Sequence, residues 1–553
     1  MAMTLPLPRK LGAAALCVLL STCSGGGKSD VHTDYDPLAV AETRGLRLDN
    51  RDAHVPPQCY TKTDGASNPC WSCHTAVNGL NFADDARLQE TYAFTDEGQT
   101  NHWTNLFVDR GAKIAAISDE VALTYIRQDN YTPLLSAIKN SRNYRGWRPD
   151  IDLMRGFDAE GFAVDGSWWR AYRYKPFLGT FWPTNGSTDD VIIRLPAAFR
   201  TGADGKPSRE IYKINLAILE ATMGAGDNIA AADIVRGIEP VSETIAGLDL
   251  DGNGRIEGRA TRMHGLPARY VTYDEHGNAT QLAVRRWQYP LGTEFLHTVR
   301  YLDPDAPDFM SARVKEVRYM VKLMAFSDAL LKTRYAAEAQ EERKGLRPTY
   351  GGTPARGLHN NFGWQLNAFI EDEQGRLRVQ TYEEHHFCMG CHTGLGVTVD
   401  QTFSFARKAP GAAGWGHQAL TGLQDTAQTA QAEPEVKTYL HRVGAGDEFR
   451  ANTEMLRRFF PAGVLDTATV QRAAPGGPDD LAKLLLPSRQ RALALDKAYM
   501  SLVSEQRFER GRDAVISPPA NVHQHIDKDS DTGLKAGVGV FNDGRLWLQW
   551  PSP

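Results

Sequence analysis

Residues 362–392 read FGWQLNAFIEDEQGRLRVQTYEEHHFCMGCH, and this stretch carries the signals that decide both the fold class and the chemistry of the chain. Phe362–Ile370 and Leu377–Tyr382 are apolar and aromatic runs of strand length, and the polar segment Glu371–Arg376 separates them. This pattern predicts a β-hairpin. Its second strand leads directly to His385 and to the pentapeptide Cys388-Met389-Gly390-Cys391-His392.

The same pentapeptide pattern occurs a second time, at Cys70-Trp71-Ser72-Cys73-His74. Two thiols with two residues between them can add across the two vinyl groups of one haem, and the next imidazole then lies below the iron as its proximal ligand. The predicted thioether residues are Cys70, Cys73, Cys388 and Cys391. The predicted proximal ligands are His74 and His392, so we expect two covalently bound haem c groups.

Other uses of these cysteines fit the pattern less well. A zinc site with four cysteine ligands needs its two pairs about 15–20 residues apart, whereas these pairs start at residues 70 and 388. A redox-active dithiol would not explain why histidine follows both pairs. Cys59 stands apart from the pairs; we favour a buried packing residue there over a thiolate ligand or redox-sensing thiol.

The two pentapeptides together resemble dihaem c-type cytochromes and, at the level of these motifs, dihaem cytochrome c peroxidase-type proteins. In the peroxidases each motif lies in one of two similar domains, and one haem transfers electrons while the other carries out the chemistry. The wide separation of the motifs in this chain, and the aromatic region between them, depart from that plan.

The N-terminus has the pattern of an export signal. Arg9 and Lys10 precede the apolar run Leu11–Leu20, which is too short to span a bilayer. Leu20-Ser21-Thr22-Cys23 then resembles the lipobox of bacterial lipoproteins, with Thr22 where Gly or Ala is usual. We expect residues 1–22 to be a signal peptide and Cys23 to be lipidated, giving a periplasm-facing or cell-surface lipoprotein, by preference on the outer membrane. A plain secretory signal is the alternative.

Composition and length describe a globular protein of several segments. Of the 553 residues, 42% are hydrophobic and 23% charged, which suits a large buried core. The net charge of −5 argues against nucleic acid as a partner. We expect an α+β fold in which two mainly helical or irregular haem-binding segments flank a mixed domain with β-hairpins. The expected parts are a flexible tether at 23–50, a first haem-binding segment at 51–135, a middle domain at 136–345 and a second haem-binding domain at 346–553.

Periodicity predicts several further elements. We expect a strand at Asp189–Leu195 and a hairpin formed by Tyr270–Tyr273 and Leu282–Trp287. Ser311–Arg334 has apolar residues at near-helical spacing, which predicts an amphipathic helix. Additional helices are expected at 433–442, 447–460 and 479–510.

The second axial ligand of each iron would decide the function. A histidine or methionine closes the iron and suits electron transfer, whereas an open position permits reaction with peroxide or oxygen. The leading candidates for this ligand are His54 and His102 near the first motif, and His385 and His386 just before the second.

A possible calcium loop begins at Asp249 and resembles the first nine residues of an EF-hand. The candidate ligands are Asp249, Asp251, Asn253, the carbonyl of Arg255, and Glu257. Ala260 stands where the bidentate glutamate belongs, so Glu257 or a distant carboxylate would have to substitute. The alternative is a polar turn that binds nothing.

Three functions remain open at this level. The first is an electron-transfer lipoprotein that serves redox partner proteins of the periplasm or outer membrane and reaches the membrane through its N-terminal lipid. The second is a dihaem oxidoreductase, peroxidase- or oxygenase-like, with one open haem. The third is a binding protein whose middle domain recognises a ligand or partner.

Overall fold

The computed structural model describes residues 35–74, 89–224, 229–429, 431–443, 452–471, 480–534 and 547–550. Residues 36–553 form one compact unit. The predicted signal peptide and the lipidation residue Cys23 lie outside the described residues. The predicted segment boundaries at 51, 136 and 346 stay a prediction.

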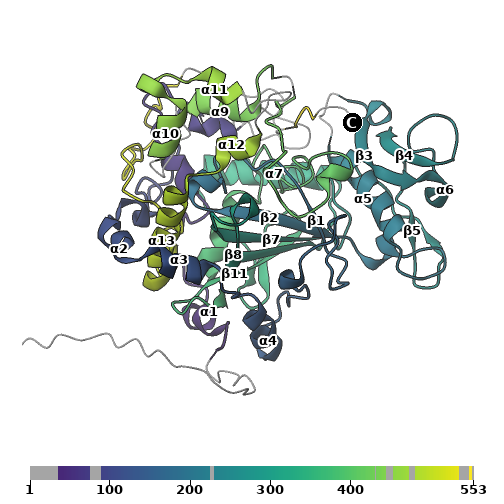
Figure 1. The fold of residues 1–553 in the computed structure, drawn as a ribbon, viewed down its shortest axis with the longest axis horizontal. Coiled ribbons are helices and arrows are strands. Elements are labelled where there is room, and N and C mark those ends of the chain that lie inside the picture. The colour runs from purple at the N-terminus through teal and green to yellow at the C-terminus, as the bar shows by residue number, and fades with distance from the viewer. Residues whose placement is uncertain are drawn as a thin grey trace, which may run out of the picture. The chain divides into compact units, whose positions relative to one another are not determined.

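An antiparallel sheet forms the centre of this unit, and its strands lie side by side in Figure 1. Within the described residues it has eight strands in the order β1-β2-β7-β8-β11-β10-β9, with β12 also paired to β11. The strands are β1 (Arg170–Tyr172), β2 (Thr188–Arg194), β7 (Glu294–Leu302), β8 (Met310–Lys322), β9 (Gly352–Thr353), β10 (Gly357–His359), β11 (Trp364–Glu371) and β12 (Leu377–Val379).

The two faces of the sheet carry different kinds of side chain. One face presents Ile192, Leu296, Val317 and Phe369, which pack against Leu134 and Ile138 of helix α4 (Thr132–Asn140). Because side chains alternate along a strand, the residues between them point to the other face. The cross-strand row Val191–His297–Arg318–Ala368 lies there, set by the pairing of β2, β7, β8 and β11.

Helices surround the sheet, and α13 lies beside α2 and α3 (Figure 1). The helices other than α4 are α1 (Ala39–Arg44), α2 (Gly111–Ala116), α3 (Asp119–Ile126), α5 (Arg209–Met223), α6 (Glu243–Ala246), α7 (Asp328–Arg343), α8 (Tyr382–His386), α9 (Glu435–Val443), α10 (Thr453–Phe459), α11 (Thr467–Gln471), α12 (Leu481–Leu485) and α13 (Arg489–Glu505). The mixed α+β fold class is therefore confirmed.

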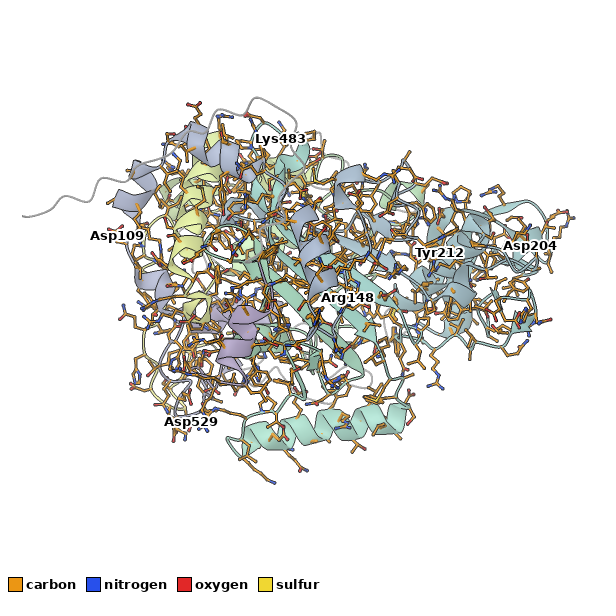
Figure 2. All side chains as sticks on the ribbon, turned by 90° about the horizontal axis from the view of Figure 1, so that it is seen from below. Asp109, Arg148, Asp204, Tyr212, Lys483 and Asp529 are labelled. Carbon is orange, nitrogen blue, oxygen red and sulfur yellow. The ribbon has the colours of Figure 1, made fainter. Side chains whose placement is uncertain are left out.

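A smaller substructure stands at one end of the unit, where Figure 2 labels Tyr212 and Asp204. Ser208 caps helix α5 by accepting a hydrogen bond from the Ile211 amide. The apolar residues of α5 are buried in a core that also includes Phe295 and Met320 of the central sheet. It packs on the two-stranded sheet of β3 (Val235–Ser242) and β4 (Arg259–His264). A short hairpin of β5 (Thr272–Tyr273) and β6 (Ala279–Thr280) lies in the same part of the chain.

The predicted strands agree with the observed elements more closely than the predicted helices do. The strand at Asp189–Leu195 is β2, and the hairpin in the opening stretch of sequence is β11 and β12, with Phe369 opposite Val379. The hairpin around Asp274–Asn278 is confirmed in part, because its second strand is Ala279–Thr280 rather than Leu282–Trp287.

The predicted helix at Ser311–Arg334 is wrong. Residues 310–322 form strand β8, and the helix in this region, α7, begins only at Asp328. The charged residues Lys315, Glu316 and Arg318 suggested a solvent-exposed helix face, yet Lys315 and Glu316 are buried and the Arg318 guanidinium pairs with Glu316 at 2.9 Å. With these positions inside, the β-branched valines at 314, 317 and 321 favour a strand buried on both faces.

The predicted helix at 479–510 is also wrong as one element. It consists of α12 and α13, which are interrupted at Leu486–Ser488. Pro487 disfavours helical geometry at the residue before it, and Ser488 caps α13 by accepting a hydrogen bond from the Arg491 amide. The helix predicted at 433–442 corresponds to α9, and the one predicted at 447–460 corresponds to α10, with residues 447–451 lying outside the described residues.

Candidate functional site

The second CxxCH motif is positioned by the sheet. Strand β12 ends two residues before Thr381, whose hydroxyl accepts the Glu384 amide while the Glu384 carboxylate accepts the Thr381 amide. This reciprocal cap starts α8, and a 3₁₀ turn at Phe387–Gly390 follows directly. In that turn the amides of Cys391 and His392 both donate to the carbonyl of Cys388, at 3.2 and 3.0 Å.

The first motif has the same local geometry. Asn68 caps a 3₁₀ turn at Pro69–Ser72 by accepting the Trp71 amide. The amides of Cys73 and His74 then donate to the carbonyl of Cys70, at 3.1 and 2.9 Å. Each motif thus turns its two cysteines and its histidine around one carbonyl oxygen. The described cysteines are all free thiols.

Both motifs line a single cavity of about 1290 Å³. This exceeds the roughly 300–1,000 Å³ of ordinary small-molecule pockets. The predicted attachment and proximal residues all contribute to its wall: Cys70, Cys73, His74, Cys388, Cys391 and His392. Asp529, labelled in Figure 2, is another lining residue.

Direct packing holds the two motif segments together. The backbone of Gly390 lies so close to the carbonyl of His54 that a Cβ on Gly390 would stand 2.2 Å from that oxygen. Phe387 packs edge-on against Trp103, with ring centroids 5.6 Å apart. Cys59 lies near both Cys70 and Cys391, and desolvation raises the pKa of its thiol to about 12, so it is a neutral thiol that is partly buried.

The two predicted proximal imidazoles are partly buried and neutral. Burial lowers the pKa of His74 and of His392 to about 4 in each case. The Nδ1–H of His392 donates to the carbonyl of Gln401 at 2.9 Å, which leaves the lone pair of Nε2 free. A neutral imidazole whose other nitrogen is held by a carbonyl is the usual arrangement of a metal ligand. The His392 side chain therefore fits a proximal iron ligand. At the first motif, Nδ1 of His74 has no hydrogen-bond partner among the described residues, so the fit there rests on the two thiols and the position of the histidine in the turn.

The four predicted second axial ligands differ in what their surroundings allow. His385 donates from Nδ1 to the Thr381 carbonyl and accepts the Ala368 amide at Nε2, so neither ring nitrogen is free and the structure argues against it as a ligand. His386 donates from Nδ1 to Tyr382, and neither it nor His102 lines the cavity. His54 alone among the four lines the cavity, beside Asp52.

The sheet supplies site residues that the sequence reasoning missed. Asp189 of β2, His297 of β7, and Glu316 and Arg318 of β8 also line the cavity. The Arg318 guanidinium lies near Cys388 and Cys391. Residues 294–302 read EFLHTVRYL, and recognising this alternating pattern as a strand would have placed His297 on the same face as Phe295 and Val299.

The possible calcium loop is partly assembled. The carboxylates of Asp249, Asp251 and buried Glu243 lie within 4.8 Å of one another. The position expected for the last ligand is Ala260, buried in β4, and the distant carboxylate beside the loop is Glu243 rather than Glu257. Glu243 and Asp249 also accept backbone amides of the loop.

The side chains of Asn253, Arg255 and Glu257 are exposed, and Arg255 forms an ion pair with Glu257 at 3.1 Å. Calcium binding stays a prediction.

Among the helices of the described residues, none is long and apolar enough to cross a membrane.

Comparison with known proteins identifies a lipoprotein family. The family model that matches residues 43–470 describes a lipoprotein. An "Uncharacterized lipoprotein" of Aquifex aeolicus (strain VF5) is 31% identical over 598 aligned residues, covering 96% of this chain and 97% of the relative. No solved structure matches the chain.

These findings overturn the predicted relationship to dihaem c-type cytochromes and to the cytochrome c peroxidase type. The match over residues 43–470 includes both motifs, and neither the family nor the relative is described as a cytochrome. The correction has a physical reason: a pentapeptide specifies local chemistry at one turn, whereas kinship is a property of the whole fold.

Proposed function

The chain belongs to this lipoprotein family, and on that premise we propose that it is an electron-transfer protein with two covalently attached haem c groups in one cavity. The observation that carries the proposal is that both CxxCH motifs, far apart in sequence, line the same cavity. The proposed location is the outer membrane, to which a lipid on Cys23 would hold the exported protein.

The chain's own groups fit the attachment chemistry. Burial raises the pKa of Cys70 and of Cys391 to about 11, so both thiols are protonated, and neither forms a disulfide. Thioether formation adds the S–H of each cysteine across one vinyl double bond: the sulfur bonds to one carbon and the hydrogen goes to the other. The turn around the carbonyl of the first cysteine holds the two thiols and the imidazole in the order that this reaction requires.

When bound, haem supplies a reversible one-electron couple. The protein would orient each group through its proximal imidazole and keep water away with the wall of the cavity. Arg318 and Arg512 share the buried carboxylate of Glu316, at 2.9 and 2.8 Å, so cationic groups lie beside the second motif. A neutral imidazole has a lone pair with which it would bind the iron.

Intact-mass measurement tests the proposal directly. The full chain is produced in a bacterial host that carries the c-type haem attachment machinery, and the purified protein is compared with Cys70→Ser/Cys73→Ser, Cys388→Ser/Cys391→Ser and the quadruple variant. We expect the added mass of two haems, one, one and none. Cys59→Ser is the matched control and should keep both. A wild-type chain without covalent haem would refute the proposal.

A second experiment separates electron transfer from catalysis. The purified protein is titrated with dithionite and then reoxidised by a soluble electron acceptor, and its ferric form is mixed with cyanide and with peroxide. We expect reversible one-electron chemistry at both haems and no spectral change with either ligand. Peroxide turnover by the purified protein would instead favour an oxidoreductase with one open haem.

A further inference from the structure

His297 is a partly buried histidine that the attachment motifs leave unexplained. It stands in the middle of β7, with Val191 of β2 on one side and Arg318 of β8 on the other. Its side chain keeps 18% of its surface accessible, and this residue lines the same cavity as both CxxCH motifs. It is therefore held between two paired strands while its side chain lines the site.

The ring of His297 is held in one orientation. Nδ1 donates a hydrogen bond to the carbonyl of Asp190 at 2.8 Å, and Phe181 packs edge-on against the ring with centroids 5.2 Å apart. The carboxylate of Asp189 lies 3.5 Å from the same Nδ1. No hydrogen bond engages Nε2 within the part of the chain that the structure describes, so this nitrogen presents its lone pair.

Comparison with two other histidines of the site shows what this arrangement favours. His385, whose role is structural, uses both ring nitrogens in hydrogen bonds to the backbone. His392, the proximal residue of the second motif, has Nδ1 on a carbonyl and Nε2 free. His297 follows the pattern of His392. A carbonyl on Nδ1 selects the tautomer in which Nε2 can bind a metal.

Building on the proposed function, we infer that His297 is the second axial ligand of one haem iron in this cavity. Arg318 is the cationic group beside the ring, and the carboxyl groups near it are those of Asp189, Asp190 and Glu316. The ligand is thus supplied by the sheet and not by a histidine near either motif in sequence.

The test compares ferric His297→Ala with His417→Ala by electron paramagnetic resonance and visible spectroscopy. His417 binds the same aspartate, through Nε2 to Oδ2 of Asp190 at 3.1 Å, but does not line the cavity, so it is the matched control. In His297→Ala we expect one additional haem equivalent per chain to become high-spin, and added imidazole to restore the low-spin signal. His417→Ala should leave the spectrum unchanged.

The substitution is also measured in variants that carry a single haem, and the covalent haem in each sample is counted by mass. Combined with the two double-serine variants, His297→Ala should change the spin state in one background and not in the other. If His297→Ala leaves every haem low-spin, or if imidazole does not restore the signal, the inference is refuted. Its failure differs from failure of the proposed function, because covalent haem is counted by mass in each sample. Should the alanine variant not fold, His297→Gln is measured in the same way.

Discussion

The contact between Gly390 and His54 predicts a specific consequence of adding one methyl group. Gly390 lies inside the second CxxCH motif, and the segment at His54 precedes the first. A Cβ at position 390 would stand 2.2 Å from the carbonyl oxygen of His54 and 3.3 Å from Cδ of Pro56. Ordinary contacts begin near 3.4 Å, so one backbone must retreat by about 1 Å.

The expected magnitude follows from the nature of the obstructing atom. Overpacking a well-packed site costs about 1–3 kcal/mol, and a backbone carbonyl cannot rotate away as a side chain can, so we expect the upper part of that range for Gly390→Ala. A loss of about 2–3 kcal/mol raises the unfolded population roughly 30- to 150-fold. Urea unfolding of wild type and variant, followed by tryptophan fluorescence, measures the shift.

Gly394→Ala provides the control for this experiment. Its Cβ would stand 2.0 Å from a carboxylate oxygen of Glu338, which is the end of a flexible side chain and can move aside. We therefore expect less than about 1 kcal/mol of destabilisation there. Equal stability of Gly390→Ala and wild type would show that the two motif segments do not pack as described, and would refute the reasoning.

Three further predictions concern stability and ions. Glu435→Gln should destabilise the fold by about 3–5 kcal/mol in denaturant unfolding, because buried Arg407 and Lys175 lose the carboxylate that they bind at 2.7 and 3.2 Å. The control is Glu433→Gln, at a side chain that is 44% exposed, and it should cost less than about 1 kcal/mol. Burial acts to raise the pKa of Glu435, but Arg407 and Lys175 outweigh it and lower the pKa from 4.5 to about 2. The stabilisation that the ionised Glu435 provides is therefore present above pH 4.5 and is lost as the pH falls toward 2. The difference in melting temperature between wild type and Glu435→Gln should shrink over that pH range. A constant difference would contradict the assignment. If the loop at Asp249 binds calcium, the ion should raise the melting temperature of wild type and not of Asp249→Asn, and the absence of any calcium response in wild type would remove this site.

The sequence by itself determined the features that depend on neighbours along the chain. The two CxxCH turns, the hairpin of β11 and β12 and the strand β2 could be predicted because their signals are the spacing of thiols and the alternation of apolar residues. The lipobox likewise indicated a lipoprotein, which agrees with the family. The same local signals led to the wrong kinship, since they describe single turns and not the fold.

Tertiary structure decided what depends on residues distant in sequence. In sequence, strand β8 resembles the charged face of a helix. In the fold, the buried carboxylate of Glu316 pairs with both Arg318 and Arg512. Burying a charge is tolerable only with such partners, and the sequence does not identify the distant Arg512 as one of them. His297 enters the site because β2, β7 and β8 pair in one register, and Gly390 meets His54 because their segments share one cavity wall. Local sequence specifies which groups are available, and packing selects which of them meet.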